Sequence, residues 1–329
     1  MMNLRHFSTQ ARGLALAAIA LLAVALVPAH AQQRTGYPNK PITLVIPSAA
    51  GGGLDVAMRH VAKRLSEEMG VTVITENKPG VNLLIGTRYV ANAAPDGYTL
   101  LAMSNTFLGA TVFADGAGYD PFRDFITVSS IAQGANLLLV NTSSGINSAR
   151  ELVERSKSAG ANKLSFGSAG IGSSPHVAAQ LFVKSTGTDY IDVPYQGTAP
   201  AMVDLLGGRI TFLFDSVAVS LPHLKSGALR ALAVTTAKRS AQLPAVPTMA
   251  EAMNLPDYNL PLFYGIAVPA KTPPDVVKTL HAALTRLTAD ATLREQFNVM
   301  GFELMGSESP EEYTRFLRQQ LDKLKSLKN

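Results

Sequence analysis

The chain has 329 residues, of which 47% are hydrophobic and 16% charged, with a formal net charge of +5. It contains no cysteine, which excludes disulfides, cysteine-ligated zinc, iron–sulfur clusters and thiol nucleophiles. Its basic residues form neither a long run of like charge nor an arginine-rich stripe with interleaved aromatics, so we do not expect it to bind nucleic acid.

The first 31 residues have the pattern of a secretory signal peptide. Arg5 and Arg12 precede the small and apolar run Gly13–Val27, and Ala29-His-Ala31 follows as a small-residue cleavage site. The alternative is a membrane anchor, but this apolar run is shorter than the roughly 20 residues that span a bilayer. No Arg-Arg pair or lipoprotein cysteine occurs, so we predict Sec export, cleavage after Ala31 and a periplasmic protein.

Two segments repeat one local pattern of strand, small-residue turn and amphipathic helix. In the first, strand Ile42–Ile46 and a glycine-rich turn lead into a helix that reaches Leu65. In the second, strand Lys163–Phe166 and turn Gly167–Ser174 lead into a helix over Pro175–Lys184. Small side chains let a ligand approach the backbone, and a helix start offers unpaired N–H groups and a positive dipole end. A facing pair of such turns would suit a clamp on a small carboxylate.

Short apolar runs alternate with helical patterns along the whole chain, which indicates an α/β fold with parallel sheets covered on both faces. Two helices near the C-terminus are expected to begin at Pro274 and Pro310, the latter after a capping box at Ser309. The predicted strands are Ile42–Ile46, Val71–Glu76, Tyr98–Ala102, Asn136–Val140, Leu164–Phe166, Ile210–Phe214, Leu229–Val234 and Gly265–Val268.

The middle of the chain has its own set of strands and helices and leaves through a proline-rich loop. We therefore predict a lobe inserted at residues 133–255, with the other lobe formed by residues 32–132 and 256–329. The chain would then cross between the lobes twice, which makes a hinge, and a cleft between lobes is a common ligand site.

Small and polar residues at the helix starts and strand ends are the candidate ligand contacts. Gly51–Gly53 could instead be only a flexible turn, and His176 could orient its turn. Capping of helices or loops is the alternative for Asp55, Ser168, Ser173, Ser174 and Asp215. Tyr195 could supply an aromatic wall and a hydroxyl. Ser104 and Asn105 follow a predicted strand and could likewise be either ligand contacts or loop caps. The predicted ligand-binding residues are Ser48, Gly51, Gly52, Gly53, Asp55, Ser104, Ser168, Gly172, Ser173, Ser174, His176, Tyr195, Gly197, Thr198 and Asp215.

A set of motifs in chain order resembles the extracytoplasmic solute receptors of tripartite tricarboxylate transporters, often called Bug proteins. The set covers essentially the whole chain after the predicted signal peptide. Its members are Tyr37–Ile42, Pro47–Arg59, Glu76–Gly80, Pro95–Leu100, Tyr119–Phe125, Phe166–His176, Val193–Gly197, Leu205–Arg209, Leu221–Thr235 and Pro244–Glu251.

The resemblance implies a type II periplasmic-binding-protein fold whose two lobes close on a small organic carboxylate. It also implies a receptor that delivers this solute to membrane permease subunits, or that informs a membrane sensor. We expect the protein to be a monomer. In the family, the turns matching Ser48–Asp55 and Ser168–Ser174 approach the ligand carboxylate, partly through ordered water, and Tyr195–Thr198 lies at the same cleft.

One segment, Gly80–Gly86, departs from the family pattern. Where the family commonly reads Gly-Ala-Gly-Gly-Asn-Ile-Gly, this chain has Gly-Val-Asn-Leu-Leu-Ile-Gly. Val81 and Leu83 replace small residues beside the cleft. We expect a narrower or more apolar pocket that prefers a monocarboxylate or an apolar-bodied acid to citrate.

The main alternative is a serine hydrolase that uses Ser174, His176 and Asp215. No G-x-S-x-G elbow is present, and a spacing of two residues at a helix start rarely lets an imidazole reach the hydroxyl. A phosphate loop is also missing, and the histidines after residue 31 show no metal-ligand spacing. We therefore predict no enzyme activity, no cofactor and no metal.

Overall fold

The computed structural model describes residues 36–160 and 163–328. The predicted signal peptide, residues 1–31, lies outside the described residues. Residues up to Asn39 form a separate unit, and the description below concerns the unit that begins at Lys40. Within the described residues, no helix has both the length and the apolarity needed to cross a bilayer.

The first lobe is built on a six-stranded sheet with the order β11-β4-β10-β3-β1-β2. β1 is parallel to β2 and β3, whereas β10 runs antiparallel between β3 and β4. The strands are β1 (Ile42–Ile46), β2 (Val73–Asn77), β3 (Thr99–Ser104), β4 (Phe125–Gly134), β10 (Leu262–Pro269) and β11 (Phe302–Leu304).

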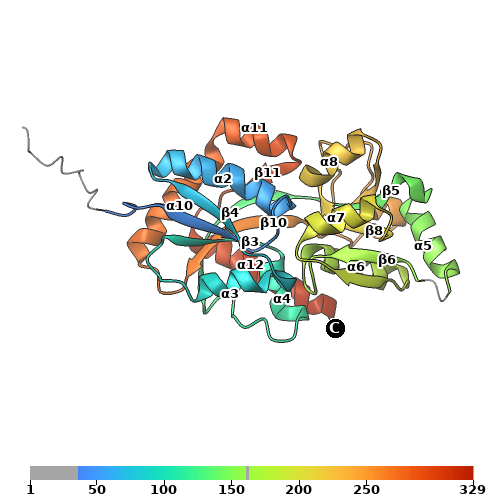
Figure 1. Ribbon diagram of the computed structural model, residues 1–329, viewed down its shortest axis with the longest axis horizontal. Coiled ribbons are helices and arrows are strands. Elements are labelled where there is room, and N and C mark those ends of the chain that lie inside the picture. Colours follow the sequence, from blue (N-terminus) through green and yellow to red (C-terminus); the bar gives the residue numbers. More distant parts are fainter. Residues whose placement is uncertain (1–35, 161–162, 329) are drawn as a thin grey trace, which may run out of the picture. The chain divides into compact units, whose positions relative to one another are not determined.

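Helices cover this sheet (Figure 1), and its apolar side chains are buried. Val45 of β1, Leu101 of β3 and Leu317 of the last helix are fully buried in one cluster. The two predicted C-terminal helices are confirmed and begin at Pro274 and Pro310. The helices of this lobe are α2 (Gly53–Met69), α3 (Leu84–Ala91), α4 (Thr106–Phe113), α10 (Pro274–Ala289), α11 (Ala291–Val299) and α12 (Pro310–Lys328).

The second lobe is built on a five-stranded sheet with the order β7-β6-β8-β5-β9. Alternate residues of β5 enter two clusters: Leu138 packs on one face of the sheet, and Leu137 and Leu139 on the other. Its elements are β5 (Asn136–Asn141), α5 (Ala149–Ser158), β6 (Ser165–Ser168), α6 (Ser174–Thr186), β7 (Ile191–Pro194), α7 (Thr198–Leu206), β8 (Phe212–Ser216), α8 (Val217–Lys225), β9 (Leu229–Val234) and α9 (Met249–Met253).

The α/β class is confirmed, but both sheets are mixed rather than parallel. β10, β4 and β11 are antiparallel to their neighbours in the first sheet, as is β5 in the second. Antiparallel strands that are buried on both faces read as the same continuous apolar run as parallel ones, so the pattern alone does not separate them. The boundaries 133 and 255 of the inserted lobe stay a prediction.

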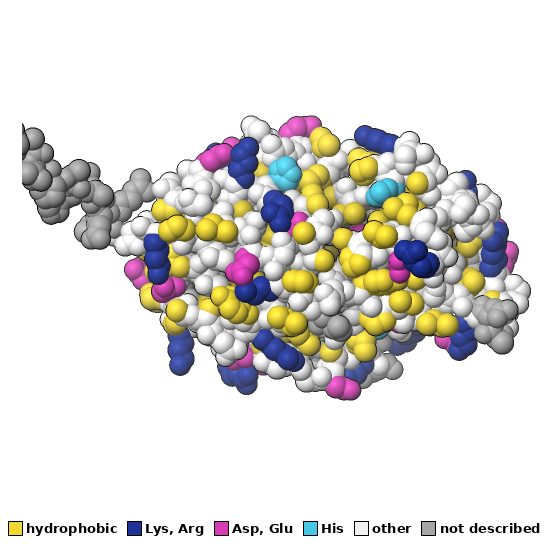
Figure 2. All heavy atoms as spheres, in the orientation of Figure 1, with side chains coloured by type: hydrophobic (Ala, Val, Ile, Leu, Met, Phe, Trp, Pro, Cys, Tyr) yellow, Lys and Arg dark blue, Asp and Glu magenta, His cyan; other side chains and the backbone are white. Residues whose placement is uncertain are grey.

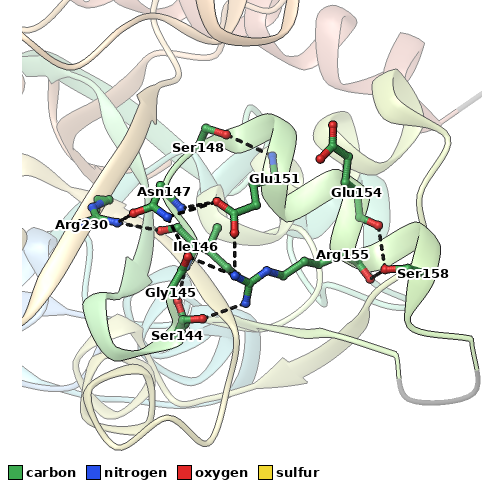
Figure 3. A network of polar contacts seen from close by, with 10 residues as sticks. All are labelled: Ser144, Gly145, Ile146, Asn147, Ser148, Glu151, Glu154, Arg155, Ser158 and Arg230. Atoms are coloured by element: carbon green, nitrogen blue, oxygen red, sulfur yellow. Dashed lines mark hydrogen bonds and ion pairs between the residues drawn. The ribbon is translucent and has the colours of Figure 1, made fainter.

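The turn between β5 and α5 is held by a network of polar contacts (Figure 3). The Arg155 guanidinium donates to the carbonyl oxygens of Ser144 at 2.8 Å and Gly145 at 3.0 Å, and it also pairs with Glu151. Arg230 of β9 donates to the Ile146 carbonyl at 3.2 Å. These contacts order the outer end of the second lobe. On the face seen in Figure 2, basic and acidic side chains are scattered rather than gathered.

Candidate functional site

A cavity between the two lobes receives residues from both strand–turn–helix units. Its free volume is about 50 Å³. Sites for drug-sized ligands measure roughly 300–1,000 Å³, so this cavity suits a small ligand. The lining residues are Ser48, Gly52, Gly53, Leu54, Leu83, Ser104, Thr106, Leu262 and Tyr264 from the first lobe and Asn136, Ala169, Ser174, Pro175, Gly197, Thr198 and Asp215 from the second.

The β1–α2 turn presents an uncapped helix start to this cavity. The N-cap residue of α2 is Gly52, which has no side chain to accept a hydrogen bond from the first N–H groups of the helix. A Cβ at Gly53 would lie 2.5 Å from the Ser216 hydroxyl and 2.8 Å from the Tyr264 hydroxyl, so a side chain there would displace both hydroxyls. Ser48 lines the cavity, and its hydroxyl is buried without a hydrogen-bond partner among the described residues.

Asp55 does not line the cavity, because its carboxylate serves the turn itself. It accepts from the N–H of Gly51 at 2.9 Å, from Asn77 Nδ2 at 2.8 Å and from Arg59 Nε at 3.0 Å. Burial alone would raise the pKa of Asp55, but these hydrogen bonds outweigh it and lower the pKa. Gly51 has a φ of +82°, which suits glycine, and it also lies outside the lining. Both residues therefore shape the turn.

The β6–α6 turn uses most of its polar side chains internally. Ser173 is the N-cap of α6, and its hydroxyl accepts from the N–H of Ala169 at 3.2 Å and of His176 at 3.4 Å. The Ser168 hydroxyl accepts from the N–H of Gly170 at 3.2 Å. Neither Ser168, Gly172 nor Ser173 lines the cavity.

Ser174 is the hydroxyl of this turn that lines the cavity. Its oxygen accepts from Asn136 Nδ2 at 2.7 Å. No described residue accepts its proton, so the hydroxyl can donate to a ligand while Asn136 fixes its position.

His176 holds the turn from within α6. Its Nδ1 accepts from the N–H of Gly172 at 3.2 Å, and its ring meets Phe113 edge-on at 6.0 Å. Its Nε2 lies 3.9 Å from Asp192 Oδ2. Burial lowers the pKa of His176, against the opposing effect of the Asp192 carboxylate, so the ring is neutral and Nδ1 acts as acceptor. His176 does not line the cavity, and these contacts are with residues of the turn and its surroundings.

The β7–α7 turn approaches the β1–α2 turn across the gap between the lobes. The N–H of Ala49 donates to the carbonyl of Gln196 at 3.2 Å. Gly197, with a φ of +125°, and Thr198 line the cavity. Tyr195 does not, because its hydroxyl donates to Asp204 Oδ2 at 2.7 Å and holds the ring against α7.

Two strand ends complete the polar lining. Ser104, the last residue of β3, donates to the Thr106 hydroxyl at 3.4 Å. Asp215 of β8 is buried, and burial raises its pKa to about 6, partly offset by the hydrogen bond from the Ser216 N–H and by the nearby Thr198 hydroxyl. Burial, together with the neighbouring Asp215 charge, raises the pKa of Tyr264.

Several lining residues were not predicted. Asn136 is the first residue of β5 and follows the crossing between the lobes. A polar residue at the start of an otherwise apolar strand could have marked it as a candidate site residue. Tyr264 lies in β10, which begins three residues before the predicted strand Gly265–Val268. The other unpredicted lining residues are Leu54, Leu83, Thr106, Ala169, Pro175 and Leu262. Leu83 was expected beside the cleft but was not assigned to the site.

The hydrolase constellation is not assembled. Ser174 is bonded to Asn136, whereas the His176 ring is bonded to Gly172 and faces Asp192 rather than Asp215. Across residues 36–160 and 163–328, no group of three His, Asp or Glu side chains is placed to hold a metal ion.

Known proteins match this chain over nearly its whole length. A family model described as the tripartite tricarboxylate transporter family receptor matches residues 57–329. The periplasmic binding protein BugD is 33% identical, with a TM-score of 0.84 over 88% of this chain and 97% of BugD. The R. palustris protein Rpa4515 with adipate is 32% identical, with a TM-score of 0.84 over 89% of this chain and 97% of that one.

MatC from Rhodopseudomonas palustris, with bound malate, is 26% identical. Its TM-score is 0.84 over 88% of this chain and 99% of MatC. The two-lobed fold is therefore shared with the periplasmic binding protein BugD and with two proteins whose structures hold adipate and malate.

Proposed function

This chain belongs to the receptor family of tripartite tricarboxylate transporters, and from that premise we propose that it captures one small organic carboxylate between its lobes and delivers it to the membrane permease. Members of this family are solute receptors and not enzymes. We also propose that the protein works in the periplasm after cleavage of residues 1–31, in keeping with its relatives.

The observation that carries the proposal is the meeting of two helix starts at one cavity. The α2 and α6 turns bring the uncapped N–H groups after Gly52 together with the hydroxyls of Ser48 and Ser174. A micromolar ligand needs roughly −8 kcal/mol. Two helix dipoles supply about 0.3–2 kcal/mol each, and hydrogen bonds to a charged group about 1.5–3 kcal/mol each. Four such bonds are sufficient.

The apolar part of the lining favours an acid with an apolar body. Leu54, Leu83, Ala169 and Leu262 line the cavity. Adipate and malate, bound by relatives, are both small acids. We propose that a monocarboxylate or a short apolar-bodied acid binds more tightly than citrate, whose three carboxylates would have to desolvate against these side chains.

We propose that the first lobe consists of residues 32–132 and 256–329, and that the second lobe consists of residues 133–255. The two sheets support this division except at Gln133 and Gly134, which end β4 in the first sheet. The first sheet takes its strands from residues 42–134 and 262–304, and the second from residues 136–234. The chain passes between them after β4 and again after β9.

Ser174→Ala tests the site directly. The variant loses a hydroxyl donor to the carboxylate and should bind roughly tenfold more weakly or worse, which is about 1.4 kcal/mol. A thermal-shift screen of carboxylates identifies a ligand, and calorimetry measures its affinity.

Ser158→Ala is the matched control, because Ser158 is exposed and donates only to carbonyls of its own helix. Unchanged affinity in Ser174→Ala would remove this residue from the site. A failure of every carboxylate to bind the unmodified protein would overturn the proposed function.

A sensing role with a membrane signalling partner is the second candidate. It would use the same cavity and a different docking surface. Deleting the gene separates the two roles: lost uptake of the ligand supports transport, whereas intact uptake with a lost transcriptional response supports sensing.

A further inference from the structure

Asp215 is a buried carboxylate with one oxygen left over. It lies in β8, is 3% exposed, and lines the cavity. Its Oδ1 accepts from the N–H of Ser216 at 2.7 Å. Its Oδ2 is buried, and no described residue donates to it. Buried carboxylate oxygens are ordinarily bonded, because an unpaired one has lost its water without compensation.

A capping role does not account for this carboxylate. The bond to the neighbouring Ser216 N–H uses Oδ1 alone, and a polar residue without a charge could make it. A buried charge is costly to keep unless something pairs with it. The second oxygen is therefore the part of Asp215 that needs an explanation.

Among the described residues, no cation pairs with Asp215. The groups that act on its pKa besides burial are the Ser216 N–H on its own strand and the Thr198 hydroxyl at the start of α7. Tyr264, from β10, is the titratable group that responds to its charge. The cavity lining given above contains no lysine, arginine or histidine.

We infer that Asp215 accepts a hydrogen bond from the ligand, so that the cavity selects a carboxylate that also carries a hydroxyl or ammonium donor. This inference rests on the proposed function, in which the same cavity holds the ligand carboxylate. An ionised second carboxylate at this position would be repelled by Asp215 and would need a shared proton. A hydroxyl or ammonium group would supply the missing partner of Oδ2 directly.

Four straight-chain acids of equal length test the inference: pentanoate, 5-hydroxypentanoate, 5-aminopentanoate and glutarate, with the four-carbon and six-carbon series beside them. Calorimetry at pH 8.0 should give the hydroxy or amino acid at least tenfold tighter binding than the unsubstituted acid and the dicarboxylate. If 5-aminopentanoate binds more tightly than 5-hydroxypentanoate, the ligand group that meets Asp215 is an ammonium. If the two acids bind equally, a neutral donor is sufficient.

Asp215→Asn removes the charge at constant size. The variant should lose the preference for the donor-bearing acid and bind glutarate at least tenfold more tightly than the unmodified protein at pH 8.0. Asp115→Asn, the same change at an exposed carboxyl, is the control. Melting temperatures of both variants establish that they fold.

The pH profile of the unmodified protein gives a test that needs no variant. Since burial raises the pKa of Asp215 to about 6, lowering the pH from 8.0 to 6.0 protonates it in part. Glutarate affinity should then rise about tenfold, whereas 5-aminopentanoate affinity should fall slightly. Equal rankings in both proteins, or flat pH profiles, would overturn this inference and leave the proposed function standing. No binding by any acid would overturn both.

Discussion

Leu83 has an unfavourable backbone conformation, and its side chain lines the cavity. Its φ is +57° and that of Asn82 is +58°, both in the left-handed region. Asparagine tolerates this region, but leucine is disfavoured by about 1–2 kcal/mol. The family segment that this chain resembles commonly has glycine at both positions. The chain therefore accepts backbone strain where its side chain narrows a ligand cavity.

Leu83→Gly and Leu83→Ala separate the strain from the volume. Both enlarge the cavity, so both should shift the ligand preference toward longer or bulkier acids. Only glycine relieves the left-handed strain, so Leu83→Gly should be about 1 kcal/mol more stable than Leu83→Ala. Urea unfolding measures the stability difference, and calorimetry with acids of increasing length measures the preference. An alanine variant as stable as the glycine variant would contradict the strain.

For single residues, the sequence predicted which positions lie near the site better than it predicted their hydrogen-bond partners. Ser174, Thr198 and Asp215 could be proposed because helix starts and strand ends are visible in a sequence. The roles of Asp55 and Tyr195 could not, because Asp55 of α2 is held by Asn77 of β2 and Tyr195 is held by Asp204 of α7. Those partners are set by tertiary packing, which local pattern does not report.

The β6–α6 turn is an element that stabilises itself with its own hydroxyls. Ser173 caps α6, and Ser148 caps α5 in the same way by accepting from the N–H of Glu151 at 3.1 Å. Ser148 lies in the outer network of Figure 3 and does not line the cavity. The two caps thus form a natural pair for separating stability from binding.

Ser173→Ala and Ser148→Ala should each lower the free energy of unfolding by about 1 kcal/mol, the usual cost of a lost cap. Only Ser173→Ala should also weaken ligand binding, because it loosens the turn that carries Ser174. Urea unfolding and calorimetry on both variants provide the comparison. Equal affinities in the two variants would show that the Ser173 bond does not position the site.

Three strands were absent from the predicted set: β4, β7 and β11. β4 has Thr127, Ser129 and Ser130 within it, so it lacks the apolar run that marked other strands. Those hydroxyls are buried, and Thr127 bonds to Thr314 of α12 at 2.7 Å. β7 is an edge strand, and β11 has three residues. Strands that are short or internally polar give little signal.

The two lobes touch through backbone as well as side chains. The N–H of Asn82 donates to the Ala169 carbonyl at 3.3 Å, and the N–H of Ala49 donates to Gln196. A Cβ on Gly109 of α4 would lie 1.9 Å from the carbonyl oxygen of Gly172. Glycine at both positions allows this approach, so the contact depends on the absence of side chains.

Gly109→Ala should keep the lobes from reaching this arrangement. Because alanine favours a helix interior over glycine by about 1 kcal/mol, α4 should remain folded while ligand affinity falls at least tenfold. Small-angle scattering should show compaction by ligand in the unmodified protein and none in the variant.

Gly207→Ala serves as the control for that experiment, because Gly207 has a negative φ and a Cβ there meets mainly the Arg209 side chain. Normal affinity and normal compaction in Gly109→Ala would contradict a closure that depends on this contact.

For the whole molecule, the α/β class and two-lobed fold were predictable because strand–helix alternation and motif order are properties of the chain. The antiparallel direction of β5 and β10 was not predictable, because a strand's direction depends on the path of the connection that brings the chain back into the sheet.

The cavity lining lacks arginine and lysine, which has a consequence for the conditions in which the protein can work. Mobile ions in the medium largely screen the attraction between exposed charges that lie more than about 10 Å apart at 0.1 M ionic strength, but they barely affect short hydrogen bonds from enclosed amides and hydroxyls. Ligand affinity should therefore change little between dilute and saline solutions.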